Sequence, residues 1–310
     1  MTEMSKRILT AEESRRVQLK NSEAEMIARP TMTFWQGARR RLFRNPVAVF
    51  SLFLLAFLIC MVIIGPGLDG QNYTQIAASQ KNAAPNALNW FGTDALGRDL
   101  FSRIWIGAKL SLLVALVCSA IQIIVGCAYG GIMAYFGGKT DAIMMRILEI
   151  LNSFPYLLVT LLIMMVIGKN VFGLLVAMCI TSWCDTARQI RGQLMQLRES
   201  EYVQAARLIG ASPARIIMKH LLPNTVGILI LDLCSSIPSY IFTEASLSFL
   251  GLGLSGDIIS LGVLIADGKT KMQFYPWQIF YPALILCIAV LAFNLLGDGL
   301  RDAMDPRTQQ

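Results

Sequence analysis

Few side chains in this 310-residue chain are suited to bond chemistry. It has one histidine, His220, and seven cysteines that lie singly in apolar segments without a CxxC pair. Because metal sites and thiol enzymes need clustered ligands or a paired base, we predict neither here and expect small buried side chains instead. We also find no constellation of His, Cys and carboxylates typical of a membrane enzyme. The cysteines are Cys60, Cys118, Cys127, Cys179, Cys184, Cys234 and Cys287.

Two short patterns imitate nucleotide-binding motifs. Gly138-Lys139-Thr140 ends like a phosphate-binding P-loop, but Met133 stands where the first glycine is required. Gly251, Gly253 and Gly256 fit GxGxxG, yet no strand precedes them. A glycine-rich break where a helix leaves the bilayer explains the second pattern better. We therefore predict no cofactor bound by this chain and no ATPase motor of its own.

Charged residues interrupt otherwise apolar stretches. A charge inside a membrane costs roughly 2.5–3.5 kcal/mol on insertion scales, so it requires a partner or a wet cavity. Arg146 and Glu149 are three residues apart, as are Asp185 and Arg188. This spacing places both members of each pair on one helix face, and we predict two structural ion pairs.

Asp232 and Glu244 have no local basic partner. They lie twelve residues apart on one predicted helix, which separates them by about 120 degrees around the axis and about 18 Å along it. They need not share a cavity. We predict that both are polar residues of a pore or of a contact with another subunit.

The elements that position these residues are membrane helices. The chain is 55% hydrophobic and 15% charged, with a mean hydropathy of +0.55, so much apolar surface must face lipid. Stretches without charge that are long enough to span a bilayer occur four times, and two more are interrupted by charges. We predict an all-α membrane protein of six transmembrane helices. The charge-free spans are Val47–Ile64, Leu110–Phe136, Ile150–Ile167 and Met272–Gly297, and the interrupted ones are Val171–Ile190 and Thr225–Leu250.

The distribution of Lys and Arg predicts the orientation. The start of the chain is too polar for a secretory signal. Most of the 27 basic residues fall inside when both termini are cytoplasmic. The net charge of +7 then reflects topology and contact with anionic lipid, not nucleic-acid binding.

This orientation divides the chain into segments. We predict a cytoplasmic tail and interfacial helix over 1–45, a first transmembrane helix over 46–64, an external loop over 65–109, and a core transmembrane domain over 110–300. The core contains a cytoplasmic loop at 199–224, and 301–310 form a cytoplasmic C-terminus.

The loop at 199–224 predicts a helix, a turn and a second helix. Glu199 and Glu201 favour a helix start, and Gly210 supplies the left-handed residue that ends the first helix. Ser212 can cap a second helix whose first residue is Pro213 and which runs to Pro223.

The spacing within this loop resembles the EAA motif of ABC-importer permeases. The matching residues are Gln204-Ala205-Ala206, Gly210 and His220-Leu221-Leu222-Pro223, with Gln204 in place of the name-giving Glu. Further segments are similar to the dipeptide and oligopeptide permeases of that family. They are Phe91–Arg103, Gly107–Leu112, Leu247–Gly253 and Asn294–Pro306.

The resemblance implies a type I ABC-importer transmembrane fold in a bacterial-type inner membrane. It implies four kinds of partner: a second permease subunit, two cytoplasmic ATPases that bind ATP and Mg, an extracytoplasmic peptide-binding protein, and lipid. The loop would then couple ATP hydrolysis on the partners to alternating access. The coupling residues would be Glu201, Tyr202, Ala205, Ala206, Arg207, Gly210, Ser212, Pro213, Arg215 and Pro223.

The cargo remains open at this point. Peptides are implied, and Asp232 or Glu244 can meet a peptide's amino group or contact the second permease subunit. Nickel and glutathione are alternatives because the motifs concern coupling and not selectivity. A secondary transporter driven by an ion gradient is a more distant alternative, because it would favour an inverted repeat, and we see none.

Overall fold

The computed structural model describes residues 34–70, 73–254 and 257–304. Within these ranges the regular elements are helices, and strand pairing is limited to an isolated bridge between Thr93 and Asp99. Five helices are long and apolar enough to cross a membrane, and a bent pair adds a sixth span if it is counted as one. The predicted all-α membrane fold is confirmed. Residues 1–33 of the predicted tail and 305–310 of the predicted C-terminus lie outside the described residues. The five helices are α3 (Pro46–Leu68), α4 (Leu100–Phe136), α7 (Val171–Arg198), α10 (Val226–Phe249, preceded without a break by 213–225) and α12 (Trp277–Met304).

The second span begins ten residues earlier than the predicted Leu110. Asp99 caps α4 by accepting a hydrogen bond from the backbone N–H of Ser102 at 2.7 Å. A charge-free criterion missed this start because two basic residues, Lys109 and Arg103, lie inside the helix. Arg103 is buried, with its Nε 3.6 Å from Asp94 Oδ2. With α3 continuing to Leu68, the connection between the two helices is 69–99 and not the predicted 65–109.

The third predicted span, Ile150–Ile167, is wrong as a single helix. The structure has α5 (Gly138–Asn152) and α6 (Tyr156–Ile167), bent by 78° at their junction. Pro155 precedes α6, and a proline disfavours helical conformation in the residue before it, so the helix breaks there.

Close packing of α4 against α7 forms the centre of the bundle. A Cβ at Gly126 would lie 2.7 Å from the Thr186 side chain, and one at Gly130 would lie 2.5 Å from the carbonyl of Ala187. The two glycines therefore let the helices approach each other closely. We predicted that the cysteines are buried, but Cys60 and Cys287 are exposed.

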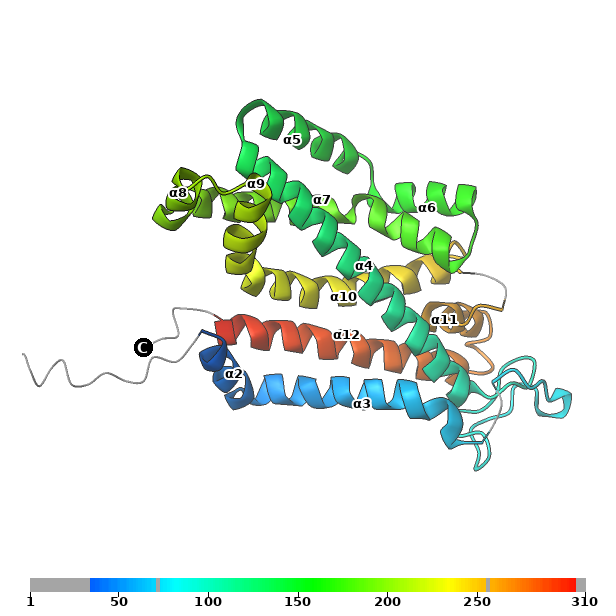
Figure 1. Ribbon diagram of the computed structural model, residues 1–310. Helices are drawn as coiled ribbons and strands as arrows, with labels where there is room; N and C mark the ends of the chain where they lie inside the picture. Colours follow the sequence, from blue (N-terminus) through cyan, green and yellow to red (C-terminus); the bar gives the residue numbers. More distant parts are fainter. Residues whose placement is uncertain (1–33, 71–72, 255–256, 305–310) are drawn as a thin grey trace, which may run out of the picture.

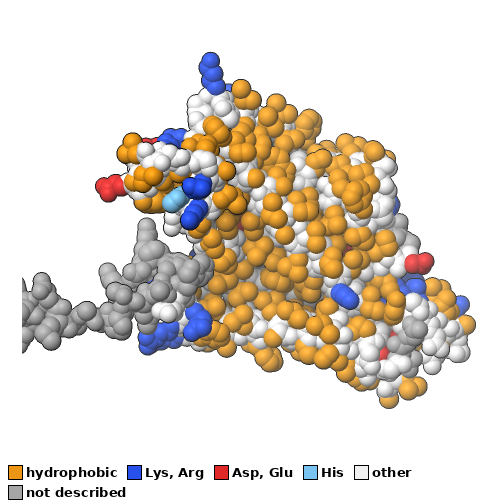
Figure 2. All heavy atoms as spheres, in the orientation of Figure 1, with side chains coloured by type: hydrophobic (Ala, Val, Ile, Leu, Met, Phe, Trp, Pro, Cys, Tyr) orange, Lys and Arg blue, Asp and Glu red, His pale blue; other side chains and the backbone are white. Residues whose placement is uncertain are grey.

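The two ends of the bundle carry different elements (Figure 1). The short helices α2 (Phe34–Arg44), α8 (Glu201–Leu208) and α9 (Pro213–Arg215) share one end with the last turns of α12. The connection 73–99 and α11 (Leu261–Lys269) lie at the other end. Hydrophobic side chains cover most of the face in Figure 2, and Lys and Arg side chains gather at the end with α2 and α8.

Candidate functional site

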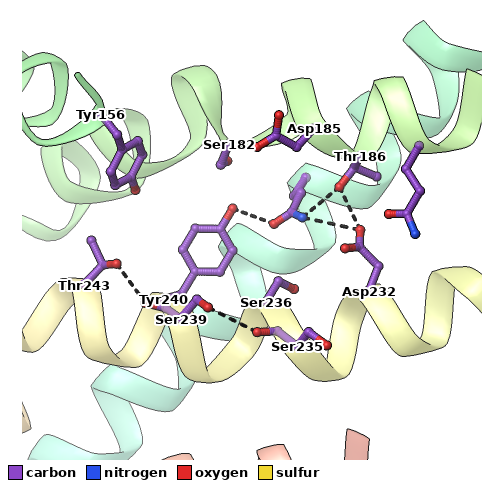
Figure 3. A pocket seen from close by; sticks show the side chains of 12 residues that line it. Tyr156, Ser182, Asp185, Thr186, Asp232, Ser235, Ser236, Ser239, Tyr240 and Thr243 are labelled. Atoms are coloured by element: carbon purple, nitrogen blue, oxygen red, sulfur yellow. Dashed lines mark hydrogen bonds between the residues drawn. The ribbon is translucent and has the colours of Figure 1, made fainter. Parts of the chain in front are cut away.

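A polar cavity of about 380 Å³ lies on the bundle between helices α4, α6, α7 and α10 (Figure 3). Its lining is almost free of aliphatic side chains, which is unusual for a surface between apolar helices. Two carboxylates are present among otherwise neutral hydroxyl, amide and phenol groups. The lining residues are Gln122, Tyr156, Ser182, Asp185, Thr186, Gln189, Asp232, Ser235, Ser236, Ser239, Tyr240 and Thr243.

A chain of hydrogen bonds in this cavity ends on Asp232 (Figure 3). The hydroxyl of Tyr240 donates to Gln122 Oε1 at 2.8 Å, and Gln122 Nε2 donates to Thr186 Oγ1 at 2.8 Å. Thr186 Oγ1 donates to Asp232 Oδ2 at 2.7 Å, and Gln122 Nε2 also reaches this oxygen at 3.4 Å. Three neutral side chains from α4, α7 and α10 therefore position one carboxylate.

Asp185 lies at the edge of the same cavity in a different environment. Its Oδ1 accepts hydrogen bonds from Arg188 Nη1 and from Asn152 Nδ2, each at 3.1 Å. The side chain is 83% exposed. The structure thus places Asp185 and Arg188 in contact, as it does Arg146 and Glu149, whose Nη1 and Oε2 are 2.6 Å apart.

Hydroxyl groups continue from Asp232 along α10. Ser235, Ser239 and Thr243 recur every four residues. Ser235 and Ser239 are exposed and Thr243 is half-buried, although their helix is a candidate membrane span. Ser239 and Thr243 donate to backbone carbonyls four residues earlier, at 3.2 and 2.8 Å. We did not predict these three residues from the sequence, yet their i, i+4 spacing could have identified a polar stripe.

Glu244 does not line the cavity. Its side chain is fully buried and accepts hydrogen bonds from Ser111 at 2.8 Å, Ser260 at 2.7 Å and Ser248 at 3.1 Å. Ser111 belongs to α4, and Ser260 caps α11 by accepting from the N–H of Val263. The structure therefore separates the two carboxylates of α10 into different sites.

The segment 199–224 forms a compact unit at the opposite end of the bundle from α11. α8 ends before Gly210, which has the predicted left-handed conformation with a φ of +84°. Ser212 Oγ accepts a hydrogen bond from the N–H of Arg215 at 3.4 Å, at the start of α9.

The second helix of this unit differs from the expected one. It is α-helical only over Pro213–Arg215, becomes a π-helix over Ile216–Leu221 (η2), and continues as a 3₁₀ turn over Leu222–Thr225 (η3) into α10. Pro223 lies inside the 3₁₀ turn and lacks the N–H that a regular α-helix would use, so the hydrogen-bond pattern changes around it.

The last residue of α8 and the cap residue that follows it have exposed apolar side chains that we did not predict as site residues. Leu208 is 89% exposed and Ile209 is 87% exposed. The preceding Val203 is fully buried, and Ala206 packs beside it in the same cluster. Of the predicted small pair, only Ala205 is exposed. We call the exposed residues Ala205, Leu208 and Ile209 the α8 apolar surface.

Polar contacts hold α8 in place. The Arg207 guanidinium lies 5.0 Å from the centre of the Tyr135 ring at the end of α4. Tyr202 Oη accepts a hydrogen bond from Asn224 Nδ2 at 3.1 Å. Gln204 donates to the carbonyl of Glu199 at 3.0 Å, so its side chain closes a local hydrogen bond within the unit.

Comparison with known proteins matches this arrangement to one family. The family model described as "binding-protein-dependent transport system inner membrane component" matches residues 122–310, and that of the "N-terminal TM domain of oligopeptide transport permease C" matches 33–85. The dipeptide transport system permease protein DppC of Bacillus subtilis is 44% identical over 94% of this chain and 92% of its own. The oligopeptide transport system permease proteins OppC of B. subtilis and Haemophilus influenzae are 38% and 42% identical, over 93% and 89% of this chain and 94% and 89% of theirs. The chain therefore belongs to the family of binding-protein-dependent transport system inner membrane components.

Proposed function

We propose that this chain is a permease subunit that moves short peptides across the inner membrane in an ATP-driven importer. The observation that carries the proposal is its similarity, over nearly its whole length, to permeases named for dipeptide and oligopeptide transport. These names refer to peptides, so we do not propose nickel or glutathione as cargo.

The unit at 199–224 supports a role in coupling to soluble ATPases. The α8 apolar surface is exposed, and exposed apolar side chains at the end of a short helix suit a groove on a partner protein. Arg215 and Lys219 lie nearby in sequence and are also exposed. In this proposal two partner ATPases bind ATP and Mg, and this chain catalyses no bond chemistry.

The polar cavity supports a role in translocation. A hydroxyl-rich stripe on a membrane helix avoids lipid by facing water or another subunit. We propose that it faces the path formed with a second permease subunit, which receives substrate from an extracytoplasmic binding protein. We propose that the end of the bundle that carries α2, α8 and the last turns of α12 faces the cytoplasm.

Substitution of Gly210 tests the coupling role. Proline fixes φ near −65°, which is incompatible with the observed +84°, whereas asparagine tolerates the left-handed region. In the complete importer reconstituted in proteoliposomes, we expect Gly210→Pro to insert and assemble but to lose ATP-driven peptide uptake. Gly210→Asn is the matched control and should keep most of the uptake.

Two measurements separate the parts of the proposal. Uptake of a labelled dipeptide and the rate of ATP hydrolysis are recorded on the same vesicles. Wild-type uptake by Gly210→Pro would refute the coupling role, and absence of dipeptide uptake by the wild type would refute the peptide cargo. The ligand that co-purifies with the cognate binding protein identifies the cargo directly.

A further inference from the structure

We propose that the cavity between α4, α6, α7 and α10 binds a primary ammonium group, with Asp232 as its anionic contact. In the proposed function this group is the free α-amino end of a peptide. Only that identification rests on the proposed function, because the chemistry of the cavity stands on its own residues.

The charge of the cavity is the first argument. The chain as a whole has a net charge of +7, but no Lys, Arg or His is among the described residues that line this cavity. Asp185 is paired with Arg188, whereas within the described part of the chain the hydrogen bonds to Asp232 come only from the neutral groups of Gln122 and Thr186. Asp232 is thus the carboxylate whose charge the surrounding residues leave uncompensated.

The geometry at Asp232 is the second argument. Gln122 Nε2 and Thr186 Oγ1 both donate to Oδ2, so Oδ1 has no hydrogen-bond partner among the described residues. Tyr240 and Gln122 are joined by a hydrogen bond that continues this network away from Asp232, and both side chains are buried. The carboxylate is thereby fixed before a ligand arrives, which lowers the entropic cost of binding.

The remaining lining suits an ammonium group better than a bare metal ion. Serine and threonine hydroxyls can accept its other N–H groups, and the rings of Tyr156 and Tyr240 present aromatic surface for a cation–π contact. The described residues contain no group of three His, Cys, Asp or Glu side chains that could hold a metal. A volume of about 380 Å³ is sufficient for one end of a peptide.

Chemical labelling of a cysteine in the cavity measures its charge directly. Ser239→Cys is introduced into a variant whose seven native cysteines are replaced by alanine, and the assembled importer is placed in nanodiscs. The probes are a cationic and an anionic methanethiosulfonate of similar size, one ending in trimethylammonium and the other in sulfonate. The readout is the ratio of their labelling rates at low salt, where screening is weak.

We expect the cationic reagent to react faster, and Asp232→Asn to lower the ratio by about tenfold, because a nearby unit charge acts on the two reagents in opposite directions. Asp298→Asn is the matched control: it removes the same charge from α12 outside the cavity and should leave the ratio unchanged. A ratio that Asp232→Asn does not change would overturn the proposal. That result is also expected if a cation of the second permease subunit already neutralises Asp232.

Ligand protection tests the preference for an ammonium group. Methylammonium should slow labelling of Ser239→Cys more than tetramethylammonium at equal concentration, because only methylammonium has N–H donors. Equal protection by both would overturn the ammonium site. If the wild type imports no dipeptide while Asp232-dependent protection persists, the proposed cargo fails and the ammonium site stands. If peptides are imported and Asp232→Asn changes neither labelling nor protection, the site fails and the proposed function stands.

Discussion

The two carboxylates of α10 lie on the same helix in opposite surroundings. Glu244 is fully buried and surrounded by three serine hydroxyls from α4, α10 and the start of α11. Asp232 lies in an open polar cavity and is contacted by two neutral side chains. The comparison shows that the sealed carboxylate joins elements of the structure, whereas the open one is available to a ligand.

The residues around Glu244 belong to a larger set of buried contacts at the end of the bundle that carries α11. Gln278 on α12 donates to both Asn82 and the carbonyl of Thr93 in the connection between α3 and α4, each at 2.9 Å. Phe91 stacks on Tyr281 with 4.1 Å between ring centres. This end of the bundle is therefore held by buried contacts, while the opposite end exposes the α8 apolar surface.

Removal of the Glu244 carboxylate is expected to have the largest effect on stability. In Glu244→Leu three buried serines lose their common acceptor, and each unsatisfied hydroxyl costs about 1–3 kcal/mol. We expect a loss of several kcal/mol, measured as a lower thermal midpoint of the purified protein in detergent. Ser235→Ala on the exposed stripe of the same helix is the control and should change the midpoint little. Equal effects of the two would remove the distinction between the sealed and open sites.

Crowding at the start of α11 should have the next largest effect. A Cβ at Gly262 would lie 2.6 Å from the Cα of Ala245 and 2.9 Å from Glu244 Oε1. We expect Gly262→Ala to destabilise the protein by about 1–3 kcal/mol, as overpacked cores do. Gly192→Ala is the matched control in α7, because a Cβ there meets nothing within 4 Å, and it should be neutral or stabilising.

The stability of the connection between α3 and α4 should depend on pH through Asp99. Burial, together with a hydrogen bond shared with Asp69, raises the pKa of Asp99 from 3.8 to about 6. The folded protein therefore binds a proton that the unfolded chain would release. The resulting stabilisation is complete below about pH 4 and is lost as the pH rises through about 6. We expect the thermal midpoint of the wild type relative to Asp99→Asn to be higher at pH 5 than at pH 7. A difference between the two proteins that is independent of pH would contradict this assignment.

The smallest expected effect concerns the opposite end of the bundle. Arg207→Ala removes the contact with the Tyr135 ring, which is worth about 0.5–1 kcal/mol at an exposed site. Amide hydrogen exchange in α8 should therefore accelerate by less than tenfold. A much larger acceleration would show that this end is held as firmly as the region around Glu244.

The sequence predicted the helical class because apolar runs of bilayer length are visible without tertiary information. It failed at two boundaries for identifiable reasons. Lys109 and Arg103 lie inside α4, and the buried Arg103 contacts Asp94 of the folded connection, which the sequence alone does not show. The break at Ser153-Phe154-Pro155 divides an apolar run that contains no charged residue, so a criterion based on charge could not detect it.

The site could be predicted only in part. The spacing around Gly210 indicated a helix, a turn and a second helix, and the structure has the expected left-handed residue there. The different roles of Asp232 and Glu244 could not be predicted, because they depend on residues far away in sequence, such as Thr186 and Ser111. The π-helix could likewise not be predicted from the sequence, since it arises where α9 continues toward α10.

The continuity of residues 213–249 has a mechanical consequence. The π-helix and the 3₁₀ turn join α9 to α10 without an intervening loop, in one helical stretch of 37 residues. A rotation or axial displacement at Pro213 is therefore expected to move Asp232 and the hydroxyl stripe beyond it. A π-turn holds one residue more than an α-turn, so converting it to α-helix would change the angular phase between the two ends by about 100 degrees. One continuous helical stretch therefore carries both the wall of the cavity and part of the surface at the end of the bundle.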